Sequence, residues 1–188
     1  MGRGINLIIF DLEGVLIDNR KRYLYALRKA NPFAKSDKEL SRSEKRIFWE
    51  TFFDPSLSDR LDKVNLVALK LLDKYVREGK KVIILSGTKK KIVNILIKKL
   101  RRVAKDKGLR FEPALIIWRG DKDFRKSPIF KLSKVRELEK ILNEEVEEIH
   151  DDDIEIVNEF RKKGINAVLW VDLKPKNRSI LDSIIKHF

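Results

Sequence analysis

Two carboxylates stand at the end of a buried-strand pattern near the start of the chain. Residues 7–16 read Leu-Ile-Ile-Phe-Asp-Leu-Glu-Gly-Val-Leu, so Asp11 and Glu13 follow an apolar run and Gly14 comes next. An apolar run of this kind suits a strand that is covered on both faces. Open α/β sheets place their active sites at the carboxyl ends of such strands. The pair is therefore a candidate for acid–base or metal chemistry, and Gly14 permits a sharp turn behind it.

Two further groups suit an anion. Ser86, Gly87 and Thr88 follow a second apolar run, and a helix pattern begins directly after them. A serine hydroxyl and the free N–H groups of a helix start make an anion site. Lys131 lies in the segment 125–131, which opens a later helix, and a lysine there can neutralise a phosphate. Together they predict a phosphorylated substrate.

A last acidic group, Asp151 and Asp152, ends a fourth apolar run just before another helix pattern. Carboxylates clustered beside a phosphate site are the ligands that Mg²⁺ requires, because it prefers oxygen and keeps several waters. The two histidines and the absence of cysteine argue against a zinc site and exclude disulfides. The sequence therefore predicts Mg²⁺.

The elements that must position these groups alternate along the chain. Strand–helix alternation implies a parallel sheet with helices on both faces, so we predict an α/β fold with a doubly wound, Rossmann-like core. The apolar runs that we expect to form strands are Ile5–Phe10, Lys81–Leu85, Ala114–Trp118, Val146–His150 and Ala167–Val171. The amphipathic stretches that we expect to form helices are 63–78, 88–107, 131–143, 153–163 and 178–187.

One interval, 18–60, breaks this rhythm because it contains no convincing strand. We expect two helices there, at about 20–30 and 41–53, and an exit turn at Pro55 and Ser56.

We interpret residues 18–60 as a helical cap inserted into an α/β core of residues 1–17 and 61–188. Its aromatic side chains either pack the insertion against the core or line a substrate pocket. They are Tyr23, Tyr25, Phe33, Phe48, Trp49, Phe52 and Phe53.

The charge is unbalanced. The chain has 43 Lys and Arg against 29 Asp and Glu, a formal net charge of +14, which favours anionic partners. The high charged fraction of 38% is also typical of thermophile proteins, although that does not explain the sign. No apolar run is long enough for a membrane span and the start lacks a secretion signal, so we expect a soluble cytoplasmic protein without membrane contact.

Taken in order, the four polar groups resemble the motifs of the haloacid dehalogenase superfamily of phosphotransferases. The resemblance covers about residues 7–171 without the insertion. The residues that fall on its four motifs are Asp11, Ser86, Lys131 and the pair Asp151 and Asp152.

The resemblance implies a phosphatase mechanism. Asp11 would attack phosphorus and form an aspartyl-phosphate. Glu13 would protonate the leaving oxygen and then activate water. Phosphatases of this superfamily usually have Asp at the Glu13 position, and an added methylene moves the carboxyl by about an ångström, a misplacement that can cost about a hundredfold in rate. Slow activity, a compensating backbone and an inactive relative are the three readings of this departure.

The resemblance also implies the ligands. Ser86, the N–H of Gly87 and Lys131 would hold the phosphoryl oxygens. The Mg²⁺ ligands would be Asp11, the main-chain carbonyl of Glu13, and Asp151, with Asp152 as ligand or close neighbour.

A closer resemblance, over 64–171, is to the phosphatase domain of polynucleotide kinase-phosphatases. Trp118-Arg119-Gly120-Asp121 and Arg125 carry it, and it implies that Arg119 helps to hold the phosphate. Thr88 stands where that family often has an arginine. No kinase P-loop occurs, so kinase activity is excluded. The implied substrates are nucleic-acid 3′-phosphate ends or nucleotides, and the alternative is a small-metabolite phosphatase that acts on sugar phosphates or nucleoside monophosphates.

The helix expected after Thr88 is strongly basic. Lys89, Lys90 and Lys91 begin next to the predicted phosphate site and could contact a nucleic-acid backbone. A charged helix face is more often simply solvated. A non-catalytic nucleic-acid-binding protein that keeps a phosphatase fold is the alternative from another functional class.

Overall fold

The computed structural model describes residues 7–187, and within them a six-stranded sheet has the order β5-β4-β1-β6-β7-β8. The first five of these strands run parallel, while β8 pairs antiparallel with β7. Their bounds are β1 (Leu7–Phe10), β4 (Lys81–Lys89), β5 (Leu115–Arg119), β6 (Val146–Asp151), β7 (Asn166–Val171) and β8 (Lys174–Pro175). The predicted doubly wound sheet is confirmed, although Ile5 and Asn6 of the first predicted strand lie outside the described residues.

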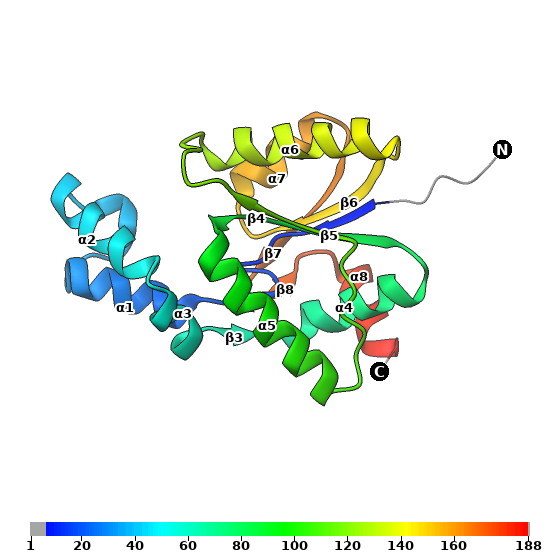
Figure 1. Ribbon diagram of the computed structural model, residues 1–188, viewed down its shortest axis with the longest axis horizontal. Helices are drawn as coiled ribbons and strands as arrows, with labels where there is room; N and C mark the ends of the chain where they lie inside the picture. Colours follow the sequence, from blue (N-terminus) through cyan, green and yellow to red (C-terminus); the bar gives the residue numbers. More distant parts are fainter. Residues whose placement is uncertain (1–6, 188) are drawn as a thin grey trace.

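Helices cover both faces of the sheet (Figure 1). On one face lie α4 (Leu66–Arg77), α5 (Lys90–Asp106) and α8 (Arg178–His187), and on the other α6 (Ser127–Leu142) and α7 (Ile154–Lys162). Side chains alternate across a strand, so β1 divides its residues between two cores. Ile8 and Phe10 pack with α4 and α5, whereas Leu7 and Ile9 pack with α6 and α7.

The segment after Ser86 differs from the prediction. The sequence pattern predicts a helix from residue 88, but β4 continues to Lys89 with an irregular register after Leu85, and α5 begins at Lys90. Thr88 is buried, and a β-branched residue suits a strand better than a helix start. The N–H groups of the α5 N-terminus therefore lie further along the chain than Ser86 and Gly87.

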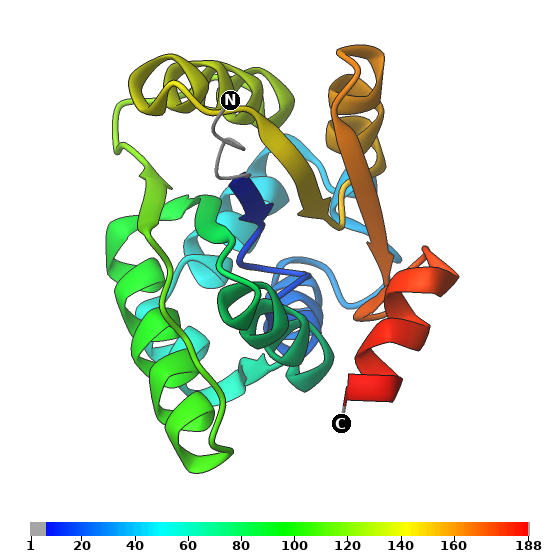
Figure 2. The ribbon, with the colours of Figure 1, turned by 90° about the vertical axis from the view of Figure 1, so that its right-hand side faces the viewer.

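Residues between β1 and α4 form a separate helical unit at the end of the sheet. It contains α1 (Arg20–Ala30), a short 3-10 helix (Asp37–Glu39), α2 (Arg42–Phe52) and α3 (Pro55–Leu61). Its helices α1 and α2 project from one end of the sheet in Figure 1 and lie behind it in Figure 2. The unit has its own hydrophobic cluster, made of Ala26, Leu27, Leu40, Phe48 and Phe52.

Two short strands, β2 (Ile17–Asp18) and β3 (Lys63–Val64), pair antiparallel where the chain enters and leaves this unit. The sequence pattern does not predict them. The predicted exit turn at Pro55 and Ser56 is wrong, since α3 begins there. Proline suits the first helical turn, and the Asp54 carboxylate accepts the Ser56 N–H as a cap.

The last turn of α3 is held by a lysine from α5. The Lys99 ammonium donates to the carbonyls of Asp59 at 2.6 Å and of Asp62 at 2.8 Å. A cation suits the negative end of a helix dipole. One charge of the basic helix α5 thus joins this helical unit to the core. Within the described residues, each helix is too short or too polar to cross a membrane.

Candidate active site

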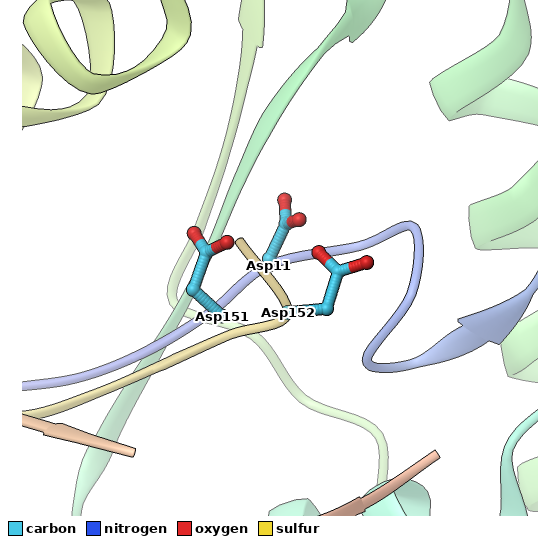
Figure 3. A group of neighbouring side chains, drawn as sticks. All are labelled: Asp11, Asp151 and Asp152. Carbon is cyan, nitrogen blue, oxygen red and sulfur yellow. The ribbon is translucent and has the colours of Figure 1, made fainter. Parts of the chain in front are cut away.

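Three carboxylates meet at the carboxyl ends of two neighbouring strands. Asp11 follows β1, and Asp151 and Asp152 lie at the end of β6, which pairs with β1 in parallel. One oxygen from each lies within 4.8 Å of the others (Figure 3). Asp11 and Asp151 are buried, whereas Asp152 is exposed. The structure therefore brings together the acidic side chains that the sequence predicted to share one site.

Lys131 from α6 lies between two of these carboxylates. Its Nζ is 2.9 Å from an Asp11 oxygen and 2.7 Å from an Asp151 oxygen. Burial disfavours the charge of Lys131, but the two carboxylates outweigh burial and raise its pKa. Burial raises the pKa of Asp11, and the Lys131 charge offsets only part of that effect. The cluster thus concentrates buried charged groups with shifted pKa values, which is typical of functional sites.

Gly14 allows Asp152 to approach the loop after β1. Its φ is +84°, and a Cβ built there would lie 1.9 Å from an Asp152 carboxylate oxygen. Any larger residue would displace that carboxylate, besides adopting a conformation that side chains disfavour. The glycine of the first motif therefore sets the position of an acidic side chain from the fourth.

The predicted anion-binding residues lie on β4 and β5 and at the start of α6. Ser86 is buried, and its hydroxyl accepts the N–H of Thr88 at 3.1 Å. The Arg119 guanidinium donates to the Ser127 hydroxyl at 2.8 Å, and a Cβ built on Gly87 would lie 3.5 Å from it. The buried Nε of Arg119 has no hydrogen-bond partner among the described residues. An unpaired buried donor is costly, so this N–H is a candidate anion ligand.

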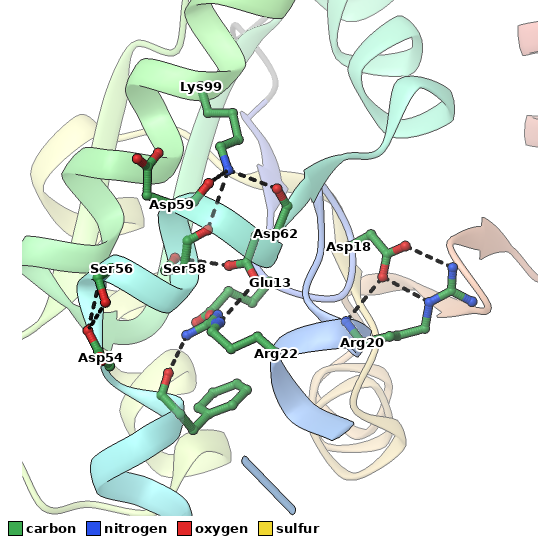
Figure 4. Close-up of polar contacts among 11 residues, drawn as sticks. Glu13, Asp18, Arg20, Arg22, Asp54, Ser56, Ser58, Asp59, Asp62 and Lys99 are labelled. Carbon is green, nitrogen blue, oxygen red and sulfur yellow. Dashed lines mark hydrogen bonds and ion pairs between the residues drawn. The ribbon is translucent and has the colours of Figure 1, made fainter. Parts of the chain in front are cut away.

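Glu13 is held by a buried arginine that sequence reasoning missed (Figure 4). The Arg22 guanidinium is fully buried, pairs with the Glu13 carboxylate, and donates to Asp62 at 3.0 Å. It also donates to the carbonyl of Phe52 at 2.6 Å and lies 4.2 Å from that ring centre. The available signal was that Arg22 precedes Ala26 by one turn, which places a cation on the apolar face of α1.

A cleft of about 700 Å³ contains these groups, which is large enough for a small ligand. Seven of the eight predicted site residues line it, the exception being buried Ser86; they are Asp11, Glu13, Gly87, Arg119, Lys131, Asp151 and Asp152. Trp49, Phe52 and Phe53 line it as well, so part of the aromatic set of the insertion faces the site.

The basic triplet after Thr88 is divided. Lys89 lines the cleft, whereas the Lys90 ammonium lies 5.1 Å from the centre of the Trp118 ring and Lys91 is exposed. The structure thus directs one of the three lysines toward the site.

His150, just before the acidic pair on β6, is a packed residue. It is fully buried, stacks on Phe10 and accepts the indole N–H of Trp170.

Comparison with known proteins gives structural matches alone. A scan against protein-family models and a sequence search of curated proteins both find no match. One similar structure is a chain of the Pnkp1/Rnl/Hen1 complex, with a TM-score of 0.56 and 21% identity over 89% of this chain. The present chain spans 46% of that longer chain.

Two other similar structures match over nearly their whole length. A hydrolase from Pseudomonas syringae has a TM-score of 0.61 and 16% identity, covering 95% of this chain and 90% of its own. A haloacid dehalogenase-like hydrolase from Streptococcus pneumoniae has a TM-score of 0.60 and 13% identity, covering 96% and 90%. The chain therefore has the fold of the haloacid dehalogenase-like hydrolases, as its four motifs predicted.

Proposed function

We propose that this protein is a Mg²⁺-dependent phosphatase that hydrolyses phosphomonoesters through an aspartyl-phosphate. The observation that carries the proposal is the convergence of Asp11, Asp151, Asp152 and Lys131 at one edge of the sheet, inside a cleft. Phosphoryl transfer needs little beyond a positioned nucleophile and neutralised charge. The fold shared with haloacid dehalogenase-like hydrolases supports this reading.

In the proposed reaction Asp11 supplies the nucleophile. A carboxylate oxygen of Asp11 attacks phosphorus while the bond to the leaving oxygen breaks, and Glu13 gives its proton to that oxygen. Glu13 then accepts a proton from the water that hydrolyses the aspartyl-phosphate. Arg22 holds Glu13 at the cleft wall during both steps.

The other predicted residues bind the transferring group. Lys131, Arg119, the N–H of Gly87 and the Ser86 hydroxyl would hold the non-bridging oxygens. We further propose that residues 18–60 act as a cap over this site, because Trp49 and Phe53 of the insertion line the cleft together with Asp11.

The acidic cluster fits a hard divalent cation, because three carboxylate oxygens lie within 4.8 Å of one another. Asp11, Asp151 and the main-chain carbonyl of Glu13 would hold Mg²⁺, with Asp152 as a further ligand or neighbour. When bound, Mg²⁺ supplies positive charge that neutralises the phosphate and offsets repulsion within the cluster. Lys131 already neutralises part of this charge.

We expect Mg²⁺ to stabilise the folded protein. At a hundredfold excess over its dissociation constant, a ligand adds about 2.7 kcal/mol, or roughly 5–10 °C in unfolding temperature for a domain of this size. Differential scanning fluorimetry with and without Mg²⁺ measures the shift. Asp151→Asn should lose it, and Glu155→Gln, an exposed neighbour on α7, should keep it. An equal shift in both variants would place the cation elsewhere.

The close approach at Gly14 gives a matched pair of variants. Gly14→Ala and Gly79→Ala both put alanine at a positive φ, +84° and +77°, but a Cβ on Gly79 meets nothing within 4 Å. Both should destabilise the fold by roughly 1–3 kcal/mol. Because only Gly14→Ala displaces Asp152, only it should weaken Mg²⁺ binding, by about 10–100-fold, in a Mg²⁺ titration of the unfolding temperature. Equal Mg²⁺ affinity in the two variants would contradict this role of Gly14.

Within the proposed activity, we propose a nucleic-acid 3′-phosphate end as the substrate. Lys89, Arg125 and Lys126 line the cleft beside the acidic cluster, and the net charge is +14. The fold likeness to a chain of the Pnkp1/Rnl/Hen1 complex agrees with this choice. Nucleoside monophosphates and sugar phosphates are the alternative substrates.

Phosphate release from a single panel tests the proposal. The panel contains a 3′-phosphorylated oligonucleotide, nucleoside monophosphates and sugar phosphates, each with Mg²⁺ or with a chelator. Mg²⁺-dependent release from the oligonucleotide supports an end-processing phosphatase. Release from small substrates alone indicates a metabolic phosphatase. Salt-dependent binding of nucleic acid without any phosphate release would favour the non-catalytic nucleic-acid-binding protein. The basic surface and the pairing of Glu13 with Arg22 are compatible with that alternative.

A further inference from the structure

Trp49 is an exposed ring at the cleft that packs against three aromatic neighbours. Its side chain is 42% exposed, yet it lies edge-to-face with Phe48 at 4.7 Å and with Phe52 at 5.8 Å. It stacks on Phe53 at 5.4 Å with an angle of 18° between the rings. A large apolar ring that is open to water and packed against neighbouring rings has little side-chain entropy to lose on binding a flat partner.

The same cleft joins this ring to cations and to the catalytic carboxylates. Lys89 and Lys126 line it, and neither has an ion-pair partner among the described residues, whereas Arg125 pairs with Asp123. A ligand that fills the cleft therefore meets an aromatic face, free positive charge and Asp11. A nucleotide at the end of a strand offers the three matching groups: a base, a neighbouring backbone phosphate and a terminal phosphate.

We propose that Trp49, supported by Phe53, stacks on the terminal base of a strand whose 3′-phosphate lies at Asp11. The inference rests on the proposed phosphatase function and names a residue that selects its substrate. Stacking tolerates every base because each base has an aromatic face, so the selection is for a base and not for a sequence. A sugar phosphate, which lacks a flat ring, gains nothing from Trp49.

The test compares two oligonucleotides that carry the same 3′-phosphate and differ only in whether the last nucleotide has a base or is abasic. We expect the wild type to favour the terminal base by about tenfold in kcat/KM. Trp49→Ala should lose this preference while its kcat/KM on the abasic substrate stays within about twofold. Trp49→Phe should keep most of the preference. Phe33→Ala, a ring of the insertion that is 90% exposed and outside the cleft, is the matched control.

A binding measurement separates the inference from the proposed activity. In an Asp11→Asn background, the 3′-phosphorylated oligonucleotide with a terminal base should quench tryptophan fluorescence, and Trp49→Phe should remove most of the quenching. Phosphate release with no preference for a terminal base in the wild type, or equal losses on both substrates in Trp49→Ala, would overturn the inference and leave the phosphatase standing. Quenching through Trp49, together with no phosphate release by the wild type, would support stacking by Trp49 and overturn the proposed phosphatase activity.

Discussion

Asp11→Asn is expected to lower the kcat of phosphate release by a factor on the order of 10⁴ or more, because an amide oxygen cannot form the acyl phosphate. The loss should appear in kcat on every substrate, since the nucleophile is common to all of them. Phosphate release under saturating Mg²⁺ measures it. Asp121→Asn is the matched control, because this aspartate lines the same cleft but lies outside the acidic cluster. It should retain activity within a few-fold.

The loss in Asp11→Asn should not come from unfolding. Burial raises the pKa of Asp11, so the folded state disfavours its charged form. A carboxyl group whose pKa is raised on folding contributes stability below its unfolded pKa and loses it as pH rises. Asparagine removes that penalty at neutral pH, and Lys131 keeps Asp151 as a partner. Without Mg²⁺, the variant should therefore unfold at or above the wild-type temperature, and normal turnover by it would remove Asp11 from the mechanism.

The core and the acidic cluster could be predicted because both follow from local pattern. Apolar runs predict strands, and the carboxyl ends of parallel strands meet at one edge. The pairing of β1 with β6 then places Asp11 beside Asp151 without any knowledge of side-chain packing. The sequence pattern places the start of the helix after Ser86 too early, because residues 86–88, Ser-Gly-Thr, resemble a helix start. In the structure Thr88 is buried and belongs to β4.

The arrangement of the insertion could not be predicted from sequence, because it depends on contacts between distant residues. Arg22 and Asp62 are 40 positions apart, and α3 is held by Lys99 from α5. Nothing local distinguishes Trp49, which lines the cleft, from Phe33, which does not. The exit proline illustrates the same point, since Pro55 can end one element or begin another, and here the Asp54 cap decides for a helix.

Arg22→Met should destabilise the fold more than any of the substitutions proposed above. The guanidinium is fully buried between Glu13 and the buried Asp62, so its removal leaves uncompensated charge in the interior. Breaking a buried ion pair in this way costs about 3–5 kcal/mol in free energy of unfolding, which urea denaturation measures. Arg28→Met, an exposed arginine on the same helix, is the control and should stay within about 0.5 kcal/mol of wild type.

The partner of Arg22 separates loss of charge balance from loss of packing. If the unpaired Asp62 carboxylate causes most of the damage, Arg22→Met combined with Asp62→Leu should destabilise the fold by less than the sum of the single changes, because the fully buried Asp62 charge is then no longer left without a partner. The stability of Arg22→Lys should fall between that of the wild type and that of Arg22→Met, since an ammonium keeps the charge but cannot present the planar fork that reaches both carboxylates. Additive single changes would show that Arg22 acts through packing on Phe52.

At a temperature where Arg22→Met is folded, kcat should also fall by about a hundredfold because Glu13 has lost the group that positions it, whereas Asp62→Leu alone leaves that contact in place.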